Sequence, residues 1–295
     1  MPELPEVETV RRGLAPVMEG ATILKVEQRR ADLRVPFPRG FARRLTGRKV
    51  VSVGRRAKYL VVDLDDGSAL VMHLGMSGSF RIRQGASEKA TASPYHPRSK
   101  AAAHDHVIFH MSGIGKKPPV TIVFNDPRRF GLMDLMPRAE LEGSKHFHAM
   151  GLEPLGNALS GAVIADLFRG RKAPLKAALM DQRLIAGLGN IYVCEALWRA
   201  RLSPDRKAGT LGTARGKDKA EALAVAIREV LEAAINAGGS SLRDHIKTDG
   251  ELGDFQHTFA VYDREGEPCL RRDGGVIRRK VHSGRSTFYC PVCQR

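Results

Sequence analysis

Apolar residues recur at two different spacings in separate stretches of this chain, and the order of those stretches restricts the fold. Residues 5–18 have apolar positions at helical spacing, with Pro5 suited to a first helical turn. From about 22 to 135, short β-rich runs alternate with turn residues, which favours antiparallel strands in a sandwich or barrel. These runs are 22–26, 49–55, 59–64, 69–74, 106–110 and 120–124.

The second half of the chain returns to a helical spacing and then to β patterning. Helices are expected over 164–168, 174–180, 191–198 and 223–234, with Gly238-Gly239 ending the last one. About thirty residues at the end have β patterning around cysteines. Two stretches without periodicity, 84–103 and 240–260, are expected to be a surface loop and a mobile segment.

This order of elements predicts a multi-domain α+β protein. Residues 1–140 are expected to form an N-terminal helix with an antiparallel β-sandwich, and 141–160 a Gly- and Pro-containing linker. A helical domain is expected over 161–260, followed by a small β-hairpin module over 261–295.

The charge of the chain favours a nucleic-acid partner. Its 48 Lys and Arg against 32 Asp and Glu leave a formal net charge of +16, and phosphate neutralisation with counterion release explains such an excess well. A surface charged only for solubility is the alternative. The chain has neither a long apolar run nor a basic, apolar leader, so we expect a cytoplasmic protein that does not enter a membrane.

The cysteines at the end of the chain indicate a metal site. Cys290 and Cys293 form a two-residue-spaced knuckle, and the pattern Cys-x3-Asp-x16-Cys-x2-Cys adds Cys269 and Asp273. Three thiolates and a carboxylate suit structural zinc, with His282 as another candidate for the fourth ligand. A zinc-free hairpin that keeps its shape by packing is the alternative. Cys194 is expected to be a buried structural cysteine.

Basic residues and a glycine-rich turn indicate where phosphates would bind. The hairpin between the metal ligands is rich in arginine and lysine, and the Gly187–Asn190 turn precedes a helix whose free N–H groups suit a phosphate. Asn190 is expected to be the N-cap. A solvated charged face and an ordinary helix cap are the alternatives.

Two glycine-flanked turns carry side chains suited to filling a gap in stacked bases. Met76 lies in HLGMSG, and Arg128 and Phe130 lie in NDPRRFG. An enzyme that extrudes a base must fill the void with apolar or planar groups, although an ordinary core role for Met76 and Phe130 stays open.

Taken together, these segments resemble the bacterial formamidopyrimidine-DNA glycosylases from end to end. Six motifs occur in the family's order: PELPEVET, RRAKYL, HLGMSGS, NDPRRFG, LMDQRLIAGLGNIY and GRSTFYCPVCQ. The resemblance implies a helix–two-turn–helix domain and a C-terminal β-hairpin zinc finger with one structural Zn²⁺. The family usually has cysteine where this chain has Asp273, and the loop at 84–103 is longer than is common there.

The resemblance implies a bifunctional glycosylase and AP lyase that removes 8-oxoguanine and formamidopyrimidines from duplex DNA in base excision repair. Once the initiator methionine is removed, Pro2 would attack C1′ and form a Schiff base, with Glu3 as the acid. Lys58 would contact phosphate and assist β-elimination, and Arg285 would be the proton donor associated with δ-elimination. The matching DNA-contacting residues are His104, Arg128, Lys172 and Asn190. The matching void-filling residues are Met76, Arg128 and Phe130.

The chemistry of these residue types agrees with the implied roles. An α-amino group has a pKa of about 8, against about 10 for lysine, so a useful fraction is neutral at physiological pH. Attack by a secondary amine leaves an iminium, which acidifies the neighbouring 2′ carbon. Glu3 is adjacent to this amine, whereas Glu6 and Glu8 either orient it or favour the helix start.

Two rival functions stay open at this point. An endonuclease VIII-type enzyme shares the Pro-Glu start and the finger but prefers oxidised pyrimidines; Leu4 and RRAKYL favour the purine-directed branch. A non-catalytic zinc-ribbon protein that binds DNA or RNA would explain the charge but not the Pro-Glu terminus. Damaged double-stranded DNA is the expected partner, and no nucleotide cofactor is expected. A search for single lesions suits a monomer.

Overall fold

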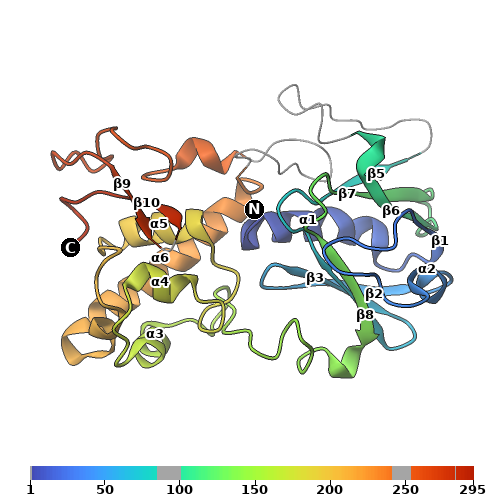
Figure 1. Cartoon of the computed structure of the whole chain (residues 1–295), viewed down its shortest axis with the longest axis horizontal. Helices are drawn as coiled ribbons and strands as arrows, with labels where there is room; N and C mark the ends of the chain where they lie inside the picture. Colours follow the sequence, from blue (N-terminus) through green and yellow to red (C-terminus); the bar gives the residue numbers. More distant parts are fainter. Residues whose placement is uncertain (1, 85–100, 241–253, 283) are drawn as a thin grey trace. The chain divides into compact units, whose positions relative to one another are not determined.

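The computed structural model describes residues 2–84, 101–240, 254–282 and 284–295, and it divides into two compact units (Figure 1). Unit 1 contains residues 1–148 and 237–256, and unit 2 contains 149–236 and 257–295. Within the described ranges, no helix has the length and apolar character needed to cross a membrane. Most of the two aperiodic stretches, 85–100 and 241–253, lies outside the described residues.

Unit 1 begins with helix α1 (Leu4–Met18), which confirms the helix expected over 5–18. Glu3 is its N-cap, and Glu3 and Glu6 form a capping box in which each side chain accepts the other residue's N–H. The buried face contains Val7, Val10 and Leu14 at helical spacing.

The rest of unit 1 consists mainly of two four-stranded antiparallel sheets, as the β-rich runs predict. One has the order β2 (Val50–Arg56), β3 (Tyr59–Leu64), β4 (Ser68–His73) and β8 (Leu132–Pro137). The other has the order β1 (Ile23–Gln28), β6 (Asp105–Met111), β7 (Val120–Asn125) and β5 (Ser79–Arg83). Both sheets and α1 contribute to one hydrophobic core, which makes this unit a β-sandwich with a helix. A short helix, α2 (Phe41–Leu45), packs near β1.

Sequence patterning did not identify strands β5 and β8. Each lies beside one of the glycine-flanked turns, and β8 has apolar residues at most positions rather than a clear alternation. The strand register explains their role, because β5 pairs with β7 and β8 pairs with β4. The two glycine-flanked turns are therefore the connections β4–β5 and β7–β8, which link one sheet to the other.

Unit 2 contains helices α3 (Gly161–Phe168), α4 (Leu175–Met180), α5 (Asn190–Arg199) and α6 (Lys217–Asn236). Ser160 caps α3 by accepting the N–H of Val163 at 3.3 Å. Strands β9 (Arg278–His282) and β10 (Arg285–Tyr289) form the expected C-terminal hairpin. A second hydrophobic cluster joins this hairpin to α5, and it includes Cys194, 1% exposed, which confirms the buried structural cysteine.

Candidate functional site

The start of the chain is buried rather than a loose tail. Pro2 is buried, and Glu3 is only 4% exposed. The N–H of Glu3 donates to Oε2 of Glu6 at 2.8 Å, while Oε1 of Glu6 accepts the N–H and the hydroxyl of Ser240 at 2.8 and 3.0 Å. Glu6 therefore joins the beginning of α1 to a segment far away in the sequence, and it fixes the backbone one residue after Pro2.

Lys58 lies at the tip of the β2–β3 hairpin and is 7% exposed. The two-residue connection places Ala57 at a φ of 52°, a left-handed conformation that is uncommon for a residue with a side chain. Arg55 supports this geometry by donating to the Ala57 carbonyl at 2.9 Å and to Glu8 of α1 at 3.2 Å. The hairpin tip with Lys58 is thus tied to the first two turns of α1.

The two glycine-flanked turns are held together by the buried carboxylate of Asp126. Its Oδ1 accepts the Ser77 hydroxyl at 2.5 Å, and its Oδ2 accepts the Gly131 N–H at 2.8 Å. Ser77 in turn accepts the N–H of Arg128 at 3.1 Å. A Cβ on Gly75 would lie 2.2 Å from the backbone of residue 130, so the close approach of the turns requires glycine there.

These contacts bring together the three residues expected to fill a void. Met76 is half-buried, Arg128 is exposed, and Phe130 is 42% exposed although it is a large apolar residue. The Arg128 guanidinium lies 4.8 Å from the centre of the Phe130 ring. A core role for Phe130 is therefore excluded, and the three side chains belong to adjoining turns.

His73 supports the same turn in its neutral form. Its Nδ1 accepts the Gly75 N–H at 2.9 Å, which requires an unprotonated nitrogen. Burial, with the nearby positive charge of Lys58 and Arg34, lowers the pKa of His73 to about 4. The ring therefore stays neutral around pH 7 and keeps its hydrogen bond.

His104 lies beside the turn that carries Arg128. It is half-buried, and its carbonyl accepts the N–H of Asp126 at 3.0 Å. The neighbouring carboxylate of Asp105 pairs with Arg81 and accepts from the Asn125 amide at 2.7 Å. Two of the expected DNA-contacting residues of unit 1, His104 and Arg128, thus lie on adjoining backbone segments.

Asn190 occupies the start of α5, but the expectation that it is the N-cap is wrong. The N-cap is Gly189, and Asn190 is the first helical residue. Its Nδ2 donates to the Ser286 carbonyl at 2.8 Å and to the Tyr262 hydroxyl at 3.4 Å, so the side chain reaches the hairpin instead of its own helix end. Lys172 is exposed in the turn before α4.

Arg285 is the exposed first residue of β10 and pairs with His282 across the hairpin. His282 does not belong to the metal group, which excludes it as the alternative fourth ligand. Its Nδ1 lies 2.8 Å from the Thr287 hydroxyl, and its Nε2 lies 2.7 Å from Asp205. Both ring nitrogens are therefore engaged in hydrogen bonds.

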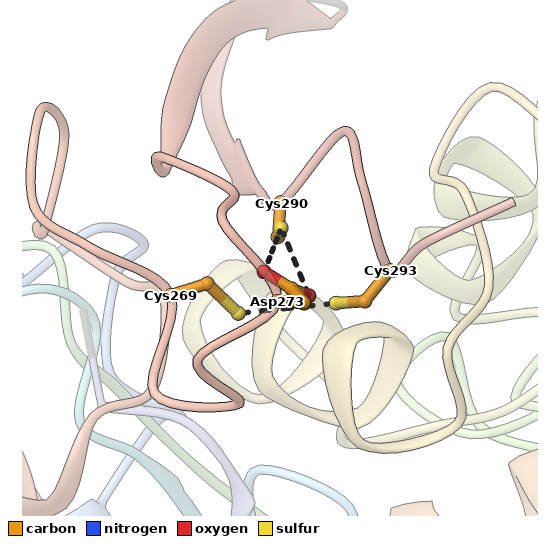
Figure 2. Close-up of side chains that lie close together, drawn as sticks. All are labelled: Cys269, Asp273, Cys290 and Cys293. Atoms are coloured by element: carbon orange, nitrogen blue, oxygen red, sulfur yellow. Dashed lines mark hydrogen bonds between the residues drawn. The ribbon is translucent and has the colours of Figure 1, made fainter.

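The four residues Cys269, Asp273, Cys290 and Cys293 converge in unit 2 (Figure 2). Their ligand atoms all lie within 4.8 Å of one another, with Sγ of Cys269 3.9 Å from Sγ of Cys293 and Sγ of Cys290 3.7 Å from Oδ2 of Asp273. A tetrahedron with metal–sulfur bonds of about 2.3 Å has edges of roughly 3.8 Å. These spacings therefore fit one tetrahedral ion.

The surroundings of this group also fit a cation. Burial and the adjacent Cys290 and Asp273 raise the pKa of Cys293, so the crowded anionic donors need a positive charge to coexist. The Gly275 N–H donates to Asp273 at 2.8 Å and lowers the pKa of that carboxyl. A Cβ on Gly275 would lie 2.5 Å from Sγ of Cys290, so glycine keeps the space open. The four residues can hold a metal ion, as the spacing of the sequence predicts.

Two buried charged residues with hydrogen bonds to backbone segments near the site were not identified from the sequence. Asp126 lies inside NDPRRFG, but nothing in the motif distinguishes a buried hydrogen-bonding hub from a turn aspartate. Lys176 reads as one more basic residue, yet it is 1% exposed. Its position on the apolar face of α4, next to Leu175 and Leu179, was the available signal.

Comparison with known proteins covers both units. The profile for the formamidopyrimidine-DNA glycosylase N-terminal domain matches residues 1–133, and the profile for the formamidopyrimidine-DNA glycosylase H2TH domain matches 150–245. A formamidopyrimidine-DNA glycosylase from Chelativorans is 60% identical over 299 residues, with full coverage of both chains. The crystal structure of MutM (Fpg) from Thermus thermophilus is 39% identical, with a TM-score of 0.80 over 99% of this chain and 98% of that one. Lactococcus lactis Fpg in complex with DNA containing an abasic site is 31% identical, with a TM-score of 0.81 and full coverage of both.

Proposed function

This chain belongs to the formamidopyrimidine-DNA glycosylase family, and from that membership we propose that it excises oxidised purines from duplex DNA and then cleaves the strand. Family membership makes it a DNA glycosylase that acts on damaged DNA in base excision repair. The finer proposal concerns the lesion and the chemistry. The observation that carries it is the buried Pro2-Glu3 start, fixed by the capping box of α1.

We propose that the nitrogen of Pro2 attacks C1′ after removal of Met1, while Glu3 supplies a proton as the sugar opens and the base departs. The C1′–N bond that forms replaces the glycosidic bond that breaks, and the base departs with a proton. The lone pair of the proline nitrogen then breaks the C1′–O4′ bond, O4′ takes a proton from Glu3 and becomes a hydroxyl, and an iminium is left at C1′. A fixed secondary amine with a pKa of about 8 retains a reactive neutral fraction near pH 7. The contact from Glu3 N–H to Glu6 keeps the residue that follows the nucleophile from moving.

The iminium acidifies the 2′ carbon, and two eliminations follow in this proposal. Loss of the 2′ proton expels the 3′ phosphate, with Lys58 assisting, and a second proton loss expels the 5′ phosphate, with Arg285 as the associated proton donor. The hairpin tip that holds Lys58 is tied to α1 through Arg55 and Glu8. Each cleavage releases one phosphate-terminated strand, so the two steps give distinguishable products.

We propose that DNA contacts come from both units. His104 and Arg128 in unit 1, with Lys172 and the first turn of α5 at Asn190 in unit 2, would bind phosphates. Met76, Arg128 and Phe130 would fill the space left by the extruded base. The exposure of Phe130 and its contact with Arg128 support this role.

Zinc is the ion we propose for the group at Cys269, Asp273, Cys290 and Cys293. Three soft thiolates favour zinc over magnesium or calcium, and four protein ligands leave no open position. A closed site of this kind supplies structure and not reaction chemistry. The metal would fix the base of the β9–β10 hairpin, where Cys290 directly follows Tyr289.

Borohydride trapping tests the catalytic proposal. Wild-type protein incubated with a duplex containing one 8-oxoguanine is expected to form a covalent adduct, and Pro2→Gly or a chain that retains Met1 is expected to lose it. A parallel duplex with thymine glycol measures lesion preference. Faster base release from thymine glycol would support the endonuclease VIII-type rival, and no adduct on any damaged duplex would refute the proposal.

A further inference from the structure

A lysine with no role in the chemistry proposed above is almost completely buried against the β9–β10 hairpin. Lys176 lies on α4 and is 1% exposed. Its Nζ donates to the Ser286 carbonyl at 3.1 Å and to the Thr287 hydroxyl at 2.5 Å. Burial of an ammonium group is costly unless it is well hydrogen-bonded, so both acceptors on β10 matter for its presence there.

A second side chain holds the same point of β10. Asn190, at the start of α5, donates to the Ser286 carbonyl at 2.8 Å. That one carbonyl therefore receives hydrogen bonds from two different helices, α4 and α5. Ser286 directly follows Arg285, so these two donors fix the backbone next to the arginine.

The Thr287 hydroxyl extends the contact into a directed chain. Lys176 donates to this oxygen, so the hydroxyl proton is available for Nδ1 of His282 at 2.8 Å. Nε2 of His282 then donates to Asp205 at 2.7 Å. Burial and the positive charges of Lys280 and Lys176 lower the pKa of His282, which favours the neutral ring that this chain requires.

The hydrogen bonds to Ser286 and Thr287 hold the backbone of β10 directly after Arg285. Arg285 is exposed, and the residue across the hairpin from it is His282, whose ring is held by the same chain. An exposed arginine has many rotamers and gains directional precision only from a fixed backbone. The other end of β10 leads into Cys290, so the metal group fixes one end of the strand and Lys176 fixes the other.

We propose that Lys176 is a positioning residue for Arg285, acting through Ser286 and Thr287 of β10. This inference rests on the proposed function, in which Arg285 serves the second elimination and Lys58 serves the first. Loss of the ammonium group is therefore expected to impair δ-elimination selectively. Schiff-base formation and β-elimination depend on residues of unit 1 and are expected to continue.

Lys176→Met tests this proposal, because methionine keeps much of the length of the side chain and removes the charge. The matched control is Lys219→Met, which removes an exposed lysine from α6 of the same unit. Each protein is incubated with a duplex carrying one 8-oxoguanine, and the β- and δ-elimination products are separated by electrophoresis. Lys176→Met is expected to lower the δ-to-β product ratio about tenfold or more, with the borohydride-trapped fraction within about twofold of wild type.

A second pair of variants keeps the test decisive if Lys176→Met fails to fold. Thr287→Val removes the hydroxyl but preserves the shape of a side chain that is fully buried, whereas Thr287→Ser retains the hydroxyl. The ratio is expected to fall in Thr287→Val and to be rescued in Thr287→Ser. A general structural role would not produce this difference while metal content stays at one ion per chain.

The outcomes separate this inference from the proposed function. Absence of a trapped adduct in wild-type protein refutes the proposed function whatever Lys176 does. A normal adduct with an unchanged product ratio in Lys176→Met, or in Thr287→Val where the lysine variant does not fold, refutes the positioning role alone. Equal loss of adduct and of both products would also refute it, because the effect would not be selective for the second elimination.

Discussion

Substitution of Glu6 by glutamine is expected to release the backbone that holds the proposed nucleophile. The Glu6 carboxylate is 2% exposed, and among the described residues it accepts hydrogen bonds from the Glu3 N–H and from both the N–H and the hydroxyl of Ser240. Glutamine replaces one of these oxygens by an NH₂ group. Whichever oxygen is replaced, at least one backbone N–H then faces another donor.

The size of the effect follows from these contacts. A hydrogen bond to a charged group contributes about 1.5–3 kcal/mol, and the bonds that stay with the amide oxygen are weaker than before. We therefore expect the free energy of unfolding of unit 1 to fall by about 2–4 kcal/mol. Displacement of a reacting group by about 1 Å can cost roughly a hundredfold in rate, so borohydride trapping of Glu6→Gln should be about ten- to a hundredfold slower.

The matched control is Glu19→Gln, at the other end of α1. Glu19 is exposed, and its Oε1 accepts the N–H of Val53 at 2.8 Å, a bond that the glutamine oxygen can keep. Trapping rates are compared at a temperature where circular dichroism shows all three proteins to be folded. If folded Glu6→Gln traps DNA as fast as Glu19→Gln, Glu6 does not position Pro2 and the reasoning is wrong.

Three further predictions concern the turns and the metal group. Asp126→Asn should lower the free energy of unfolding by about 2–3 kcal/mol and slow base extrusion, which 2-aminopurine fluorescence measures. The control is Asp66→Asn, at a more exposed aspartate with a similar serine partner, which should change the free energy of unfolding by less than about 1 kcal/mol. The pKa of His73 is about 4 in the folded protein and 6.5 in the unfolded chain, so the stability present above pH 6.5 should be lost as the pH falls to 4, by up to about 3 kcal/mol. In His73→Gln, the free energy of unfolding measured by denaturation should depend less steeply on pH between 4 and 6.5. Chelation of the metal should change the fluorescence of Trp198, the single tryptophan, because its Nε1 lies 3.4 Å from Sγ of Cys269. Asp273→Cys should retain the metal at a higher chelator concentration than wild type, and equal retention would contradict a ligand role for Asp273.

Much of the fold was predictable because the spacing of apolar residues and the positions of turn and helix-end residues agree along the chain. The helical spacing of Val7, Val10 and Leu14 was enough to predict α1, and the structure buries that face. Strands β5 and β8 were missed because their identity comes from pairing with β7 and β4, which no local pattern encodes. The start of α6 at Lys217 was missed because its first turns carry mostly charged residues and alanine, which show no clear apolar spacing.

The candidate site divides into what residue type can reveal and what only burial can reveal. The cysteines were recognisable from their type and spacing, whereas the catalytic roles of Pro2 and Lys58 came from the resemblance of the surrounding motifs to a known family. His282 was an equally plausible ligand by type, and only its contacts with Thr287 and Asp205 exclude it. The sequence order could not show which polar group turns toward the metal.

Residues that act through other residues were the hardest part of the site to infer from the sequence. Asp126 and Lys176 were not identified, and for Glu6 the sequence left open whether it orients the nucleophile or only favours the helix start. Glu6, Asp126 and Lys176 belong to residue types that are most often solvent-exposed, so the sequence alone would place them on the surface. In the structure each is at most 2% exposed and each holds a backbone segment beside a proposed functional side chain. A buried charge is retained at a cost in stability, so its position beside a site is informative about what must stay fixed. The three charges thus mark the three segments that the proposed chemistry needs to be rigid: the start of α1, the paired turns and the first residues of β10.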